Sequence, residues 1–377
     1  MDETEIMLAD AAQALLKDRH QKERLRRVYH GQSAYSRALW QCMAGQGWLA
    51  ITLAEELGGV ALKPRHAAVI TRALGRHAVP EPFAGSGAMV ARLANHLHAQ
   101  NPQGWSGVIE ALLDGERVTA LAWQESMHTL DEAPRCRATR EGDATLLRGG
   151  KAAVAAADMA DQFIVSATDG AQASAWLVPA GAPGLAVETA LGADGGTLST
   201  LRLEDVKATE PQCLGRGEDV LRALRQARDE AIVLTAAQLV GAAEEALAIT
   251  LDYLRTRKQF GKAIGSFQSL QHLAVDVRVQ QSLAQAAVRA ALQALDPDHP
   301  PQGTGVAQAL VARAKARAAQ AAQLAGRFGV QAHGAIGFAA EADIGLYLKS
   351  ALRLSAYLGN ASHHRQSISR LAPSEVE

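Results

Sequence analysis

A short basic segment, RKQFGKAIGSFQ at residues 257–268, is the first place in this sequence where side chains could do chemistry. Arg257 and Lys258 fall in the expected last turn of a long helix, and Gly261 is expected to end that helix. Basic residues in a last turn complement the helix dipole, so the segment could be an ordinary helix end. A guanidinium also matches two phosphate oxygens at once, so Arg257 and its neighbours could instead hold a phosphate. Composition alone favours the helix end.

A second segment, SAYLGNASHHRQ at residues 355–366, brings two histidines together near the end of the chain. His363 and His364 are consecutive, so on a helix their rings point in different directions. No carboxylate or cysteine nearby has the spacing of a metal ligand, and we predict no metal site. Gly359 and Asn360 indicate the C-terminus of a helix, with Asn360 able to cap the following turn.

The overall composition is that of an ordinary globular protein. The 377 residues are 48% hydrophobic and 20% charged with a net charge of −1, which argues against nucleic acid or an anionic membrane as the main partner. No apolar run reaches the roughly 20 residues that span a bilayer. The N-terminus is acidic where a secretion signal would be basic and then apolar, so we predict a cytoplasmic protein. The three cysteines form no CxxC pair and are interpreted as buried thiols: Cys42, Cys136 and Cys213.

The hydrophobic period divides the chain into three parts that must position these segments. An N-terminal domain at 1–115 is predicted to be helical, because apolar residues recur there at three- and four-residue steps. A central domain at 116–212 holds short apolar segments between Gly, Asp and Pro turns, including a hairpin around Glu141-Gly142-Asp143, which indicates a compact all-β domain. A C-terminal domain at 213–377 returns to the helical period and predicts four long antiparallel helices.

Two long motifs resemble the acyl-CoA dehydrogenase family. They are DYLRTRKQFGKAIGSFQSLQHLAVD around Arg257 and QAHGAIGFAAEADIGLYLKSA from Gln331 onward, and EELGG at residues 55–59 also fits. The resemblance covers almost the whole chain and implies an α+β multidomain fold: an N-terminal helical domain, a small central β-barrel-like domain and a C-terminal four-helix bundle. It also implies a tetramer that binds FAD non-covalently, removes the α proton of an acyl-CoA and passes the β hydride to the flavin.

The resemblance assigns cofactor contacts residue by residue. Three residues match the segment that contacts the FAD pyrophosphate and adenosine: Arg257, Gln259 and Phe260. Gln268 matches a glutamine that reaches the FAD of another subunit. A further stretch that reaches a neighbour's FAD is matched by Gln331, Gly334, Ala335 and Gly337. Small residues there let the backbone approach the cofactor closely, and Ala335 replaces the second glycine of the family's pair.

The residue that removes the α proton is missing from its usual places. In much of the family it is the glutamate of a Tyr-Glu-Gly step, and the matching position here is Leu358. Some members carry it on the first long helix of the bundle, where the matching position is Ala231. Neither side chain can accept a proton. Glu230 becomes the candidate base if the alignment slips by one residue; otherwise Asp229 and Glu230 are interpreted as a solvated or capping pair near a helix start.

Other family features near the flavin are also weak. The flavin-contacting stretch of the β domain is matched by WQESMHTLD at residues 123–131, where Glu125 and Ser126 remain but the glycine-rich part is gone. The later Trp-Ile-Thr step is matched by Ala153-Val154-Ala155. These traits resemble a branch that acts on CoA thioesters of steroid side chains and other bulky acids, in which some members work as α2β2 heterotetramers.

Three hypotheses follow from these residues. The chain is a flavoprotein acyl-CoA dehydrogenase that acts on a bulky acyl-CoA, with electron-transfer flavoprotein as the acceptor, alone or in a complex. Alternatively, it is a non-catalytic partner subunit that helps to hold FAD for a different chain. The third hypothesis is a helical binding module with no flavin, in which the two motifs would be relics. The missing glutamate favours the second hypothesis, and the retained FAD motifs fit the first two.

Overall fold

The computed structural model describes residues 2–20, 22–130, 133–299, 303 and 305–371, which form two compact units. We call residues 1–30, 64–80 and 232–377 the helical unit, and residues 31–63 and 81–231 the sheet unit. Helix α6 (Glu218–Thr256) is divided between them after Ala231. The three-domain division given above stays a prediction.

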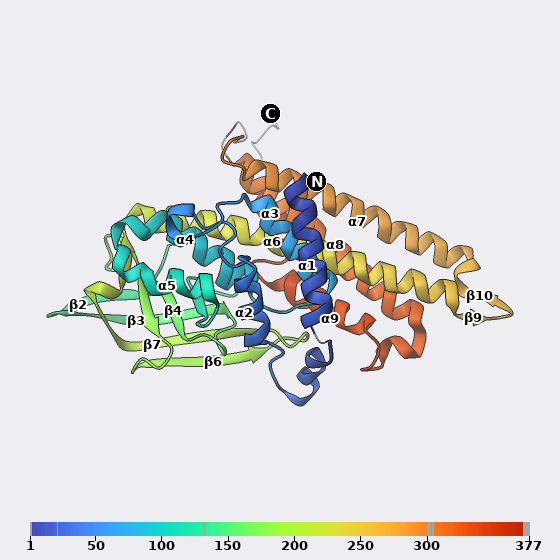
Figure 1. Cartoon of the computed structure of the whole chain (residues 1–377), viewed down its shortest axis with the longest axis horizontal. Helices are drawn as coiled ribbons and strands as arrows, with labels where there is room; N and C mark the ends of the chain where they lie inside the picture. The colour runs from blue at the N-terminus through green and yellow to red at the C-terminus, as the bar shows by residue number, and fades with distance from the viewer. Residues whose placement is uncertain (1, 21, 131–132, 300–302, 304, 372–377) are drawn as a thin grey trace. The chain divides into compact units, whose positions relative to one another are not determined.

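The sheet unit is built on one mixed sheet of eight strands (Figure 1). The strand order is β6-β7-β3-β2-β4-β5-β8, and β1 pairs in parallel with β4. The strands are β1 (Thr119–Ala122), β2 (Arg137–Glu141), β3 (Ala144–Ala155), β4 (Gln162–Thr168), β5 (Ala173–Pro179), β6 (Leu185–Leu191), β7 (Thr197–Thr209) and β8 (Cys213–Arg216). Within the described residues β6 and β8 end the order, so the central β domain is present as an open sheet.

The predicted hairpin is confirmed between β2 and β3. Glu141 pairs with Ala144, and Gly142 takes a φ of 61° at the first of the two turn residues. A two-residue hairpin of type II′ needs a positive φ at that position, which glycine adopts without strain. Along β7, the side chains of Ser199, Leu201 and Leu203 are buried and alternate with exposed ones, as expected for a strand with one face on the core.

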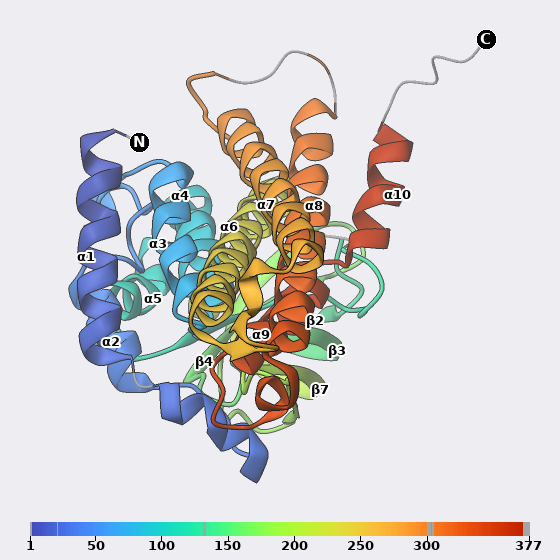
Figure 2. The same ribbon diagram turned by 90° about the vertical axis from the view of Figure 1, so that its right-hand side faces the viewer.

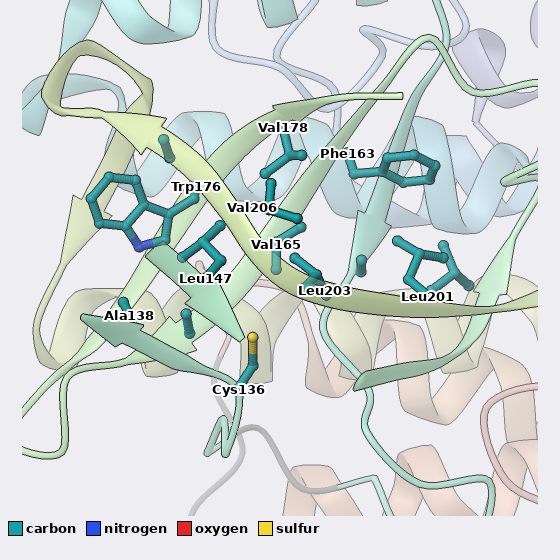
Figure 3. Packing of buried hydrophobic residues seen from close by; sticks show 14 of the residues in the cluster. Cys136, Ala138, Leu147, Phe163, Val165, Trp176, Val178, Leu201, Leu203 and Val206 are labelled. Carbon is teal, nitrogen blue, oxygen red and sulfur yellow. The ribbon is translucent and has the colours of Figure 1, made fainter. Parts of the chain in front are cut away.

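One hydrophobic cluster fills the inner face of the sheet (Figure 3). Its large members are Leu147, Phe163, Val165, Trp176, Val178, Leu201, Leu203 and Val206. The indole N–H of Trp176 donates to Ser174 Oγ at 2.8 Å, so the largest core side chain keeps its polar atom satisfied. Besides its part of α6, the sheet unit contains α2 (Arg37–Gly45), α4 (Met89–Leu97) and α5 (Pro102–Asp114), with short 3-10 or π turns at residues 55–57, 83–88, 98–100 and 210–212.

The helical unit holds the predicted bundle and further helices at both ends of the chain (Figure 2). Besides its part of α6 it contains α1 (Glu3–Arg19), a 3-10 segment (Lys22–His30), α3 (Pro64–Arg76), α7 (Gln268–Ala294), α8 (Val306–His333), α9 (Ile344–Ala356) and α10 (Ala361–Leu371). Helix α8 packs along α7, α9 and α10. Its buried face is mostly alanine, which lets these neighbours approach closely.

Among the described helices one, α6, is long and apolar enough to cross a membrane by length and composition. Of its most apolar window, 78% is buried inside the structure. A helix that is apolar on all sides is expected at the centre of a protein of this size, so we interpret α6 as a core helix.

Glycines set the distance at which α3 crosses α6 in the helical unit. A Cβ atom on Gly75 would lie 1.9 Å from the carbonyl oxygen of Gln238, and one on Gly241 would lie 2.0 Å from that of Arg72. Both contacts are with backbone, which cannot rotate away. Beside the crossing, the Gln238 side chain donates to the Val79 carbonyl at 2.9 Å, and the Tyr347 hydroxyl donates to the Arg76 carbonyl at 2.9 Å.

We therefore expect Gly241→Ala to lower the free energy of unfolding by about 1–3 kcal/mol, because overpacking forces the two backbones apart. Urea unfolding followed by circular dichroism measures the change. The matched control is Gly45→Ala in the last turn of α2, where an added Cβ meets nothing within 4 Å and should be neutral or slightly stabilising. Equal stability of G241A and the parent protein would contradict this account of the crossing.

Candidate functional site

The basic segment after α6 is a tight β-hairpin, which corrects the prediction that it ends a helix. Helix α6 stops at Thr256, and β9 (Lys258–Gln259) pairs with β10 (Lys262–Ala263). The turn residues Phe260 and Gly261 have φ angles of 54° and 79°. A type I′ turn needs positive φ at both central residues, and glycine supplies only the second without strain. Phe260 is therefore held in a backbone conformation that aromatic residues rarely adopt.

The hairpin presents its polar side chains outward. The side chains of Arg257 and Gln259 are exposed, and Phe260 is 89% exposed. Gln268 is the first residue of α7 and is also exposed. In the described part of the chain no hydrogen bond or ion pair occupies the side chains of Arg257, Gln259 or Gln268. Such donors are available for a ligand or for another chain.

The second predicted cofactor segment follows the end of α8. Gln331 lies in the last turn of α8, and a 3-10 turn (Gly334–Phe338) follows. Gly334 takes φ 63° and ψ −140°, a conformation that is essentially restricted to glycine. A Cβ on Gly337 would lie 2.4 Å from the Val330 carbonyl oxygen, so this position also requires glycine. The side chain of Phe338 is 81% exposed, and Gln331, Gly334 and Ala335 also lie at the surface.

The two segments start from helix ends that touch each other. The Tyr253 ring, in the last turn of α6, stacks on the His333 ring at the end of α8 with ring centroids 4.2 Å apart. His333 is buried, and its Nδ1 lies 2.7 Å from the Gly329 carbonyl oxygen. The structure thus brings the origins of the Arg257 hairpin and of the Gln331 segment to one end of the bundle. A guanidinium, exposed amides and glycine-rich backbone fit a dinucleotide with a diphosphate group.

Leu358, the residue that aligns with the family's usual base, lies in a turn between α9 and α10. Leu358 has a φ of 55° and is 2% exposed, and Gly359 follows with a φ of 88°. A left-handed conformation costs a non-glycine residue about 1–2 kcal/mol. Asn360 Oδ1 accepts a hydrogen bond from the His363 amide at 2.9 Å, which confirms the predicted cap. Among the described residues no group of three or more His, Cys, Asp or Glu could hold a metal ion.

A buried lysine, which the sequence reasoning missed, lies behind this turn. Lys315 Nζ donates to the carbonyl oxygens of Ser355 at 3.2 Å and Gly359 at 2.8 Å. The side chain is fully buried, and burial lowers the pKa of the Lys315 amine to about 7. One signal could have found it: in VARAKARAAQ this lysine falls on the apolar stripe that also contains Val311 and Ala318.

Glu230, the candidate base, is locked in an ion pair within the sheet unit. Its side chain is 3% exposed, and Oε2 accepts from Arg92 Nε at 2.8 Å and from a second Arg92 nitrogen at 2.5 Å. Burial raises the pKa of the Glu230 carboxyl, while Arg92 acts in the opposite direction. Asp229 is buried too and accepts from Arg228 at 2.8 Å. The interpretation of Asp229 and Glu230 as a solvated or capping pair was therefore wrong, since α6 begins earlier, at Glu218.

The segment matched to the flavin-contacting stretch is fastened by buried polar groups. Glu125 accepts from the amides of Arg135 and Cys136 at 2.9 Å and from Lys151 Nζ at 2.6 Å. The Gln124 side chain donates to the carbonyls of Ser126 and Thr129. Desolvation raises the pKa of the Glu125 carboxyl, but Lys151 and the amides outweigh it, so the pKa lies below its usual value. Glu125 is thus a structural anchor of this loop.

Comparison with known proteins identifies the family. Profiles of the acyl-CoA dehydrogenase N-terminal and C-terminal domains match residues 2–99 and 221–372. Acyl-CoA dehydrogenase IpdE2 of Mycobacterium tuberculosis is 30% identical over 92% of this chain and 90% of its own length. Acyl-CoA dehydrogenase FadE27 of the same organism is 32% identical over 89% of this chain and 88% of its own length. The chain belongs to the acyl-CoA dehydrogenase family.

Solved structures confirm the fold. The ChsE4-ChsE5 complex from Mycobacterium tuberculosis contains a chain with a TM-score of 0.85 and 25% identity, covering 100% of this chain and 99% of that one. A steroid ACAD, Tcur3481-Tcur3483, has a TM-score of 0.83 and 29% identity, covering 98% of this chain and 97% of that one. A glutaryl-CoA dehydrogenase from Mycobacterium smegmatis in complex with FADH2 has a TM-score of 0.86 and 17% identity, covering 100% of this chain and 96% of that one. The predicted α+β fold is confirmed, the similarity to a steroid ACAD supports the predicted resemblance to the steroid-type branch, and FAD is confirmed as the cofactor at the level of the family.

The lowered pKa of Lys315 predicts a pH dependence of stability. Between pH 7 and 10.5 the unfolded chain keeps the proton on this amine while the folded chain has lost it. Stability from this group therefore rises with pH, by at most about 1.4 kcal/mol per pH unit, and stays flat below pH 7. We expect Lys315→Met to remove this slope.

Urea unfolding of the parent protein and of K315M from pH 6 to 10 checks the sign, because other titrating groups cancel in the difference. Lys17→Met, at an exposed site on α1, is the control and should leave the slope unchanged. A pH-independent difference between K315M and the parent protein would rule out the buried amine as its source.

Proposed function

We propose that this chain is the FAD-binding partner subunit of a two-chain acyl-CoA dehydrogenase whose proton acceptor lies on the other chain. The observation that carries the proposal is the side chain at residue 358, a leucine that is 2% exposed. At the other base position the chain has Ala231, which is fully buried. Removing the α proton of a thioester needs a correctly aimed base, and neither position offers one.

The residues at the end of the bundle suit the cofactor role. Arg257 would hold the diphosphate of FAD, with Gln259, Phe260 and Gln268 beside it. The polar side chains of Arg257, Gln259 and Gln268 are exposed and unpaired among the described residues. Gln331, Gly334, Ala335 and Gly337 would let the backbone of the second segment approach the same kind of ligand. FAD, when bound, supplies the acceptor for the hydride that leaves the β carbon of the acyl group.

Exposed aromatic side chains support a second chain at this end of the helical unit. Phe260 and Phe338 project from the two cofactor segments, and Ile336 lies half-exposed between Gly334 and Gly337. Large apolar side chains grouped on functional loops are typical of surfaces that another chain or a ligand covers. The similarity to a chain of the ChsE4-ChsE5 complex is consistent with an assembly of two different chains.

The same relatives guide the proposal for the substrate. The similarity to a steroid ACAD supports a bulky acyl-CoA as substrate, namely a CoA thioester of a steroid side chain, which the assembled tetramer would α,β-desaturate. Electron-transfer flavoprotein is the proposed electron acceptor, and the cytoplasm is the proposed location.

Purification of the chain alone and with its partner tests this function. We expect the isolated chain to be colourless and the complex, obtained by co-expression with a related chain that carries the glutamate, to show the absorption of bound flavin. Because the base is on the other chain, only the complex should reduce a dye with an acyl-CoA. A yellow homotetramer that turns over an acyl-CoA would contradict the partner role.

A second candidate function is catalysis by this chain with Glu230 as the base. One observation favours it: Glu230 Oε1 is buried and has no hydrogen-bond partner in the part of the chain that the structure describes. Together with the raised pKa, this is how a general base is often prepared. Against it stand the double contact of Oε2 with Arg92 and the register, which places Ala231 at the matching position.

Glu230→Gln separates the two functions in the flavin-containing complex. We expect turnover of an acyl-CoA to stay within about twofold of the parent complex, because a carboxylate held by Arg92 is structural. Asp229→Asn is the matched control, since it changes the neighbouring buried carboxylate that pairs with Arg228. A loss of about 100-fold or more for E230Q alone would assign the base to Glu230.

A further inference from the structure

Lys315 on α8, which belongs to neither family motif, binds the turn between α9 and α10. Lys315 Nζ donates to the carbonyls of Ser355 and Gly359, and no carboxylate among the described residues pairs with it. A buried ammonium group is unfavourable unless fixed dipoles replace the water that it loses. The two carbonyls are those dipoles, so the amine and the turn stabilise each other.

The end of α9 adds to this arrangement. Helix α9 stops at Ala356, so the Ser355 carbonyl belongs to the last turn, where carbonyl groups lack partners within the helix. The partial negative charge at a helix C-terminus favours a cation at this place. The helix end therefore stands in for the missing carboxylate, which explains how an alanine-rich helix tolerates a buried lysine.

The turn is also held at its strained residue. His364, buried on α10, places Nε2 2.8 Å from the Leu358 carbonyl oxygen, and because a carbonyl only accepts, Nε2 carries the proton. Leu358 keeps a left-handed backbone although it is not glycine. Such strain persists only where the surroundings determine the conformation. Here Lys315 donates to the carbonyls of Ser355 and Gly359, which lie on either side of Leu358. His364 donates to the carbonyl of Leu358 itself.

We infer that Lys315 is a positioning residue that, together with His364, holds the Leu358 side chain as an apolar plug at the base position. If FAD binds as proposed, the plug would exclude water at the position where other family members place a carboxylate. The plug's effect on flavin rests on the proposed function, whereas the anchoring of residues 355–359 does not. A carboxylate on the other chain would then act beside an apolar surface from which water is excluded, where electrostatic interactions are stronger.

Two measurements on Lys315→Met test the inference. The first is hydrogen exchange by mass spectrometry on the purified chain, which needs no flavin. We expect amides at residues 357–360 to exchange at least about tenfold faster, while those in the first turns of α9 do not change. Lys349→Met, which removes a lysine from α9 itself, is the matched control. Unchanged exchange at the turn in K315M would overturn the anchoring.

The second measurement uses the co-purified, flavin-containing complex. The flavin is reduced with dithionite, and its reoxidation by oxygen is followed by absorbance. We expect K315M and Leu358→Ala each to speed reoxidation at least about fivefold, and the double variant to be no faster than L358A, because both changes remove the same plug. Additive effects, or no effect of K315M, would overturn the plug.

The two measurements distinguish failure of the proposed function from failure of the anchoring by Lys315. A complex without flavin would refute the proposed function, and the exchange experiment would still decide the anchoring. If K315M does not accumulate as a folded chain, Lys315→Arg replaces it in the exchange experiment. The arginine keeps a cation and N–H donors at this site, so protection of the turn close to that of the parent supports the role, and loss of protection in a folded K315R would contradict it.

Discussion

The burial of charged side chains is the constraint on which both units depend, because every buried charge must find a substitute for water. The structure uses three solutions. Lys151 Nζ contacts the Glu125 carboxylate at 2.6 Å and Ser166 Oγ at 2.9 Å, which fixes the loop beside β1 and β3. Glu230 is paired with Arg92. Among the described residues, Lys315 Nζ contacts only backbone carbonyls, which lie at the turn between α9 and α10.

These pairings also explain where chemistry is available. Glu125 accepts from amides and from Lys151, and Glu230 Oε2 accepts twice from Arg92, so these carboxylates are held in place by structural contacts and are poorly suited to accept a proton from a substrate. At the end of the bundle the opposite holds, since the Arg257 and Gln331 segments expose donors and aromatic rings. The buried charges described above are paired within the chain, whereas the side chains assigned to FAD are exposed and available to a ligand or to another chain.

Local patterns predicted much of the fold, and long-range contacts account for what they could not predict. The β2–β3 hairpin and the Asn360 cap depend on neighbouring residues and were found from the sequence. The burial of Glu230 depends on Arg92, which lies 138 residues away in the chain. The hairpin at Phe260 was taken for a helix end because a positive φ at phenylalanine is rare, so a helix end was the better guess from composition.

The left-handed backbone of Leu358 is imposed by the residues around the turn and not by the side chain at this position. A leucine gains nothing from a left-handed backbone, and the residue itself would favour an ordinary helix end or an extended chain. The strain is therefore imposed by its neighbours, Lys315 and His364, whose contacts reach carbonyl oxygens and do not depend on the side chain at 358. A glutamate and a leucine would be carried by the same backbone. On the proposed function, a change of side chain at this position would alter the chemistry of the site while the backbone around it stays the same, so that one scaffold could serve both as a catalytic chain and as its partner.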